Sequence, residues 1–161
     1  DIDDDGDLDL VVPKEWRTNR ILINGGSGVF TARENPFPAA KPDELIRPDT
    51  APNWLHKDTK DVSIINADGD GVLDIIMVVE GDPKFVRTNV HQYFRGNADG
   101  TYTRIYGELP DTISNAVAHD DVDGDDDIDL FISGAGQDVL VLSDGTGGSI
   151  EIYDNNGTGR F

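Results

Sequence analysis

The sequence predicts an all-β fold of the β-propeller type, with about three blades of four antiparallel strands within its 161 residues. Two observations carry this prediction. An acidic motif occurs three times, at steps of 65 and 55 residues, and an apolar segment follows each copy. A second repeated pattern, alternating apolar residues around an Asn/Asp/Gly turn, is typical of hairpins. Four short strands repeated at a period of about 40 to 65 residues indicate propeller blades.

The strands next to the acidic motifs are short and rich in apolar residues. Segments 8–12, 73–79 and 128–132 follow the three motifs, and 61–65 and 115–119 precede the second and third. Segments of this length favour buried strands over helices. The expected hairpins are 21–30, 92–102 and 150–161, with a further extended hairpin over 139–149.

These segments divide the chain into a partial blade (1–35), an inserted loop (36–60), a blade (61–110) and a blade (111–161). The inserted loop carries five of the eight prolines and interrupts the repeat. The first blade lacks an opening strand, and the third is expected to end as its final strand begins. The chain is therefore expected to be part of one propeller domain whose remaining blades belong to the same, longer protein.

The net charge of -19, from 32 acidic and 13 basic residues, argues against nucleic acid or an anionic membrane surface as a partner. The absence of cysteine excludes disulfides and thiolate metal sites. No apolar run is long enough to insert into a membrane. Because the aspartates lie in discrete glycine-containing clusters, the natural partner is a cation.

The motif D-x-D-x-D-G-x-x-D places oxygen donors at alternate positions of a loop, as Ca²⁺ requires. Positions 1, 3, 5 and 9 would bind through side chains and position 7 through its backbone carbonyl. The expected ligands are Asp1, Asp3, Asp5, Asp7 and Asp9; Asn66, Asp68, Asp70, Val72 and Asp74; and Asp121, Asp123, Asp125, Asp127 and Asp129. An EF-hand is excluded because position 12 is Val12, Met77 or Ile132 and not glutamate.

With these loops and the glycine-rich turns that end at Phe30 and Phe161, the chain resembles the FG-GAP or VCBS repeat family, found in integrin α-subunit heads. The resemblance implies that each loop joins the first two strands of a blade and binds Ca²⁺. Two positions depart from the pattern. Asn66 removes one carboxylate, which predicts a weaker second site. Asp126 replaces the glycine at position 6, where a left-handed backbone is expected.

The expected function is a calcium-binding extracellular or cell-surface scaffold for adhesion or recognition, with a protein or carbohydrate ligand on the inter-blade loops. Extracellular-type sites bind at about 10⁻⁴ to 10⁻³ M, so they fill outside the cytosol. The alternatives are the propeller portion of a secreted enzyme, such as a polysaccharide lyase or phospholipase, and a structural component of an extracellular assembly.

No catalytic residues are expected in this chain, because the regularly spaced aspartates are committed to the metal. The histidines, at positions 56, 91 and 119, are expected to be structural or at the surface. Trp16, Trp54, Tyr93 and Tyr106 could line a ligand site, although blade packing is the expected role of each. A glycosylation sequon occupies 156–158.

Overall fold

A computed structural model describes residues 1–15, 18–38, 58–80, 91–134, 138–146 and 149–154, the last segment by its backbone alone. The described residues form three antiparallel sheets in which each strand pairs with its neighbour in sequence. The strands of the first sheet are β1 (Leu10–Val12), β2 (Arg20–Asn24) and β3 (Phe30–Ala32). Those of the second are β4 (Thr59–Ile65), β5 (Asp74–Val79), β6 (Gln92–Gly96) and β7 (Tyr102–Ile105). Those of the third are β8 (Ser114–Asp120), β9 (Asp129–Gly134), β10 (Val139–Ser143) and β11 (Ser149–Asp154).

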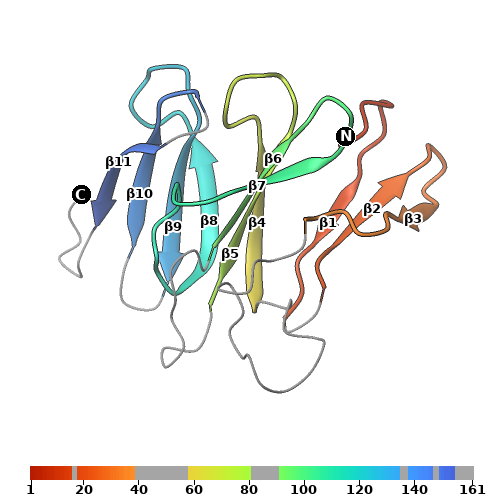
Figure 1. The fold of residues 1–161 in the computed structure, drawn as a ribbon, viewed down its shortest axis with the longest axis horizontal. Helices are drawn as coiled ribbons and strands as arrows, with labels where there is room; N and C mark the ends of the chain where they lie inside the picture. Colours follow the sequence, from red (N-terminus) through yellow and green to blue (C-terminus); the bar gives the residue numbers. More distant parts are fainter. Residues whose placement is uncertain (16–17, 39–57, 81–90, 135–137, 147–148, 155–161) are drawn as a thin grey trace.

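The three sheets lie side by side, with the β4–β7 sheet between the other two (Figure 1). Strand β5 lies at the centre of this arrangement, and all six of its residues are buried because its two faces pack against different neighbouring sheets. Ile75 and Met77 join an apolar cluster with Ile21 of the first sheet, whereas Ile76 and Val78 join a second cluster with residues of the third sheet. A strand whose two faces are both covered has a continuous apolar sequence, and residues 75–79 of β5 are such a sequence.

Polar contacts connect the neighbouring sheets. The ammonium group of Lys60 lies 2.6 Å from Glu15, which follows β1, and 3.1 and 2.9 Å from Asp58 and Glu80. The hydrogen bonds that Lys60 donates to the three carboxylates raise its pKa, and the one to Glu15 has the largest effect. On the other side, Asp61 of β4 accepts a hydrogen bond of 3.1 Å from the backbone N–H of Val117 in β8.

The all-β prediction is confirmed, and so are the strands predicted beside the acidic motifs. The described residues contain no helix, and hence none that could cross a membrane. That the three sheets are consecutive blades of a propeller stays a prediction.

The third sheet corrects one expectation, that its final strand only begins where the chain ends. Strand β11 is already its fourth strand and pairs with β10 across the turn at Asp144–Gly145. Gly145 allows that turn with a φ of 67°. The hairpin equivalent to 21–30 and 92–102 is thus β10–β11, and residues 155–161 of the hairpin predicted over 150–161 lie outside the described residues.

Most of the predicted inserted loop, residues 39–57, also lies outside the described residues. At its beginning, the ring of Phe37 packs against those of Phe94 and Tyr102, with centroids 4.6 and 5.8 Å apart. Its last two residues, Thr59 and Lys60, belong to β4.

Candidate metal centre

The three acidic loops lie on the same edge of the molecule, the upper edge in Figure 1. Loop 1 (residues 1–9) leads into β1, loop 2 (66–74) joins β4 to β5, and loop 3 (121–129) joins β8 to β9. The strand pairing therefore gives every loop the same neighbours: the strand that follows it and the end of the next strand in its sheet.

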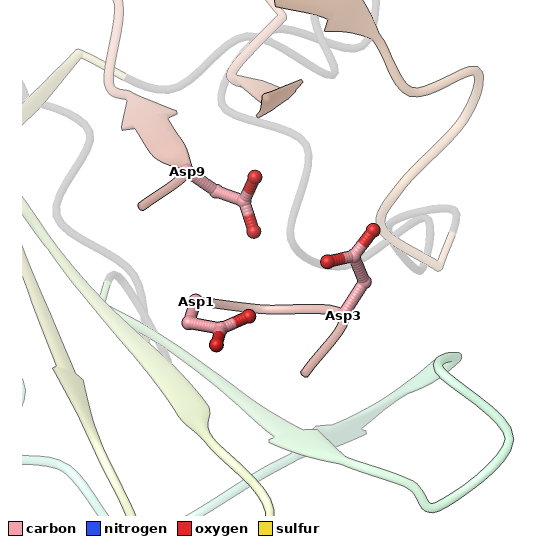
Figure 2. A group of neighbouring side chains, drawn as sticks. All are labelled: Asp1, Asp3 and Asp9. Carbon is pink, nitrogen blue, oxygen red and sulfur yellow. The ribbon is translucent and has the colours of Figure 1, made fainter. Parts of the chain in front are cut away.

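In loop 1 the side chains of Asp1, Asp3 and Asp9 converge on one space (Figure 2). One oxygen of each carboxylate lies within 4.8 Å of the others, and Asp121, Asp123 and Asp129 form the same group in loop 3. Two oxygens 4.8 Å apart can share one ion at about 2.4 Å, and three that lie closer together can surround one. Each group of three carboxylates could therefore hold a metal ion.

The aspartate at position 9 also holds the loop against its own sheet. One oxygen accepts the backbone N–H of position 2, and the other accepts the backbone N–H of the residue that ends the second strand after the loop. The donors are Ile2 and Asn24 for Asp9 (2.7 and 2.8 Å), Ala67 and Gly96 for Asp74 (2.9 and 2.7 Å), and Val122 and Ser143 for Asp129 (2.9 and 2.9 Å).

The carboxylate at position 1 accepts hydrogen bonds from the amides of the loop itself. Asp1 accepts the N–H groups of Asp5 and Gly6 at 3.1 and 2.9 Å. Asp121 accepts those of residues 124, 125 and 126 at 2.7, 3.2 and 3.2 Å. These bonds curl both loops around the carboxylate, so the ligand group is shaped before any ion enters.

At position 5, one carboxylate oxygen accepts the N–H of position 7, in Asp5, Asp70 and Asp125 alike, at 2.9, 2.7 and 3.0 Å. The expected ligands at positions 5 and 7 are not members of the two groups of convergent carboxylates. Position 6 has a left-handed backbone in every loop, with φ values of 93° at Gly6, 89° at Gly71 and 71° at Asp126. The predicted left-handed conformation of Asp126 is confirmed.

Loop 2 is built differently. Its Asn66 Oδ1 is buried and has no hydrogen-bond partner among the described residues. The Nε of Arg95 lies 3.9 Å from Asp68 Oδ2, and the Tyr93 hydroxyl donates a 3.2 Å hydrogen bond to Asp74. With Asn66 in place of aspartate, loop 2 has one carboxylate fewer, as the sequence predicts.

Two aspartates of loop 3 have raised pKa values, first through desolvation and then through the charges of neighbouring aspartates. Desolvation and the charges of Asp125 and Asp129 raise the pKa of Asp123. Desolvation, followed by the charges of Asp125 and Asp144, raises the pKa of Asp127. In loop 1 the opposite holds for Asp9, because the hydrogen bonds from Asn24 and Ile2 outweigh desolvation and lower its pKa.

The histidines and aromatic residues that the sequence singles out have structural contacts. His119 Nδ1 is hydrogen-bonded to the Ser63 hydroxyl, and the buried His91 accepts the N–H of Val79 at 3.0 Å. Tyr93 is buried in the core, and Tyr106 lies under the guanidinium of Arg104. Residues 16, 54 and 56 and the sequon at 156–158 lie outside the described residues.

A cleft of about 1000 Å³ separates loop 1 from the β6–β7 turn. Asp1 and Asp3 line one wall, and Asn97, Asp99 and Thr101 line the other. Two of the three convergent carboxylates of loop 1 are therefore open to solvent on the side of this cleft.

Sequence reasoning missed two features of the site. The backbone amides that position 9 binds belong to six residues of six different types, so no sequence signal marks them. Arg95 lies outside the motif, and only the pairing of β5 with β6 brings it beside loop 2. Comparison with protein-family models, curated proteins and solved structures finds no match for this chain.

Proposed function

We propose that the protein is a calcium-binding scaffold for adhesion or recognition, with Ca²⁺ bound in loops 1 and 3. The observation that carries this proposal is the convergence of three carboxylates in each of these loops. Carboxylate oxygens are hard ligands, which suit Ca²⁺. The metal would be held by positions 1, 3 and 9, and it would supply the positive charge that offsets their repulsion.

The binding stabilises the folded chain, because the unfolded chain does not hold the carboxylates together. At about 1 mM free calcium and a dissociation constant of about 0.1 mM, each site contributes about 1.4 kcal/mol. Two such sites contribute about 3 kcal/mol, a large share of the net stability of a typical domain. Sites of this affinity would fill only at millimolar calcium, so the proposal includes an extracellular, periplasmic or luminal location.

The recognition part of the proposal is supported by the arrangement of the loops. All three loops lie on one edge, where the cleft beside loop 1 offers polar groups to a protein or carbohydrate ligand. The repeated motif and the three sheets side by side are consistent with consecutive blades of an FG-GAP-like propeller. In that architecture, further blades of the same protein would cover the outer faces of the first and third sheets.

Thermal unfolding with and without calcium tests the proposal. We expect 1 mM CaCl₂ to raise the midpoint by about 6 to 12 °C over EDTA, given about 3 kcal/mol from two sites. The variant Asp123→Asn should lose about half of this shift. Asp4→Asn, which removes an exposed charge outside the convergent group, should keep it. Equal midpoints in calcium and EDTA would contradict the proposal.

A further inference from the structure

The three loops have different neighbours at one equivalent position. The register of the strands identifies it: the amides of Asn24, Gly96 and Ser143 all bind the aspartate at position 9, so the residues just before them are equivalent. These are Ile23 in the first sheet, Arg95 in the second and Leu142 in the third. Loop 2 alone of the three has a cationic side chain at this position.

Arg95 is held where it can act on loop 2. It belongs to β6 and precedes Gly96, whose backbone N–H donates a 2.7 Å hydrogen bond to Asp74. The β5–β6 pairing ends at Ile75 and Phe94, the residues next to Asp74 and Arg95. Its Nε lies 3.9 Å from Asp68 Oδ2. The Asp68 side chain is 10% exposed and the Arg95 side chain 42%, so solvent screens the pair from the Arg95 side only.

We propose that Arg95 serves as a built-in cation for loop 2, which therefore stays free of calcium at concentrations that fill loops 1 and 3. This inference rests on the proposed calcium function. Two changes act in the same direction: Asn66 removes one negative charge from the loop, and Arg95 adds a positive one. A divalent ion in loop 2 would have to approach the guanidinium at short range, and like charges repel. The chain would thus bind two calcium ions and not three.

Native mass spectrometry and calorimetric titration with CaCl₂ test this stoichiometry on the full chain. The wild type should bind two ions. Arg95→Leu, which introduces the residue type of the third sheet, should gain a third, weak site because Asn66 Oδ1 has no other partner among the described residues. Asn66→Asp combined with Arg95→Leu should bind the third ion at least about tenfold more tightly than Arg95→Leu alone.

The reciprocal exchange and a charge control complete the experiment. Leu142→Arg should weaken calcium binding by loop 3 by about tenfold or more, because it places a cation at the position that Arg95 occupies beside loop 2. Arg20→Leu removes the same charge from an exposed position on β2 and should leave two ions bound. Circular dichroism of each variant in EDTA shows whether it folds, and Leu142→Arg tests the inference even if Arg95→Leu does not fold.

The outcomes separate the inference from the proposed function. Three ions in the wild type, or two in the folded double variant, overturn the inference and leave the calcium function intact. No bound ion in the wild type overturns the calcium function, and the inference with it. Two ions in the wild type, three in the double variant and a weakened site in Leu142→Arg support both.

Discussion

The aspartate at position 9 of each loop accepts hydrogen bonds from two elements through its two oxygens. Asp74 and Asp129 do so while almost completely buried, at 0% and 1% exposure. A carboxylate that gives one lone pair on each oxygen to an N–H still has further lone pairs available. Position 9 can therefore anchor the loop and bind a metal at the same time, whereas an amide at this position could accept on one oxygen only.

Asp129→Asn tests this anchoring role. One carboxylate oxygen becomes an NH₂ group, which faces the N–H of Val122 or Ser143 and leaves that buried donor without an acceptor. We expect a loss of about 1 to 3 kcal/mol in the free energy of unfolding. Urea unfolding in EDTA measures it without any contribution from calcium. Asp4→Asn serves as the charge control, and an equal effect of both variants would contradict the anchoring role.

Asp126 in loop 3 has the backbone conformation that glycine has in the other two loops, with a φ of 71°. A left-handed backbone strains an aspartate more than a glycine, and this aspartate lies among other acidic residues. Asp126→Gly should therefore raise the stability of the calcium-free chain by about 0.5 to 1 kcal/mol. The reverse exchange in loop 2, Gly71→Asp, should lower it. Denaturant midpoints in EDTA decide between this result and an unchanged or reduced stability.

At the scale of strands, local pattern predicted much of the fold and less of the site. Strand β5 was predictable because burial on both faces requires a continuous apolar run, and Asp126 because a turn demands a left-handed residue. The end of the third sheet was predicted wrongly, since both Asp144–Gly145 and the glycine-rich segment near the chain end read as hairpin turns. Arg95 could not be linked to loop 2, because its position depends on pairing between strands distant from the motif.

Gly134 at the end of β9 tests how closely β8 and β9 approach. It pairs with Ser114 beside a register shift, and a Cβ here would lie 2.0 Å from the carbonyl oxygen of Ile113. Gly134→Ala should cost about 1 to 3 kcal/mol, because backbone atoms must move to admit the methyl group. Gly25→Ala, where a Cβ meets nothing within 4 Å, is the matched control. Chemical denaturation of both variants compares them, and equal stabilities would show that the strands separate freely.

At the scale of the whole molecule, the charge distribution should make the stability of the fold depend on cations and on protons. The chain carries a net charge of -19, and its acidic loops share one edge. Folding brings the carboxylates of loops 1 and 3 together, which costs free energy unless a cation or a proton offsets the repulsion. Either partner should therefore stabilise the folded state.

The pKa shifts give the sign of the proton effect. The pKa values of Asp74, Asp123 and Asp127 lie above the ordinary value of 3.8 in the folded chain, chiefly through desolvation. Since the folded state then binds more protons than the unfolded state just above pH 3.8, stability falls as the pH rises through the raised values. The pKa of Asp9 is lowered in the folded chain, so its contribution to stability is lost only as the pH falls below the ordinary value of 3.8.

We therefore expect the chain in EDTA to melt at a higher temperature at about pH 4.5 than at about pH 5.5, a range below the ordinary pKa of histidine. With saturating calcium the order should reverse, because protons then compete with the bound ion for the same oxygens. Thermal melts at constant ionic strength, with and without calcium, measure both trends. A chelated chain that is less stable at the lower pH would show that other carboxylates dominate its acid response and that the repulsion within loop 3 is small.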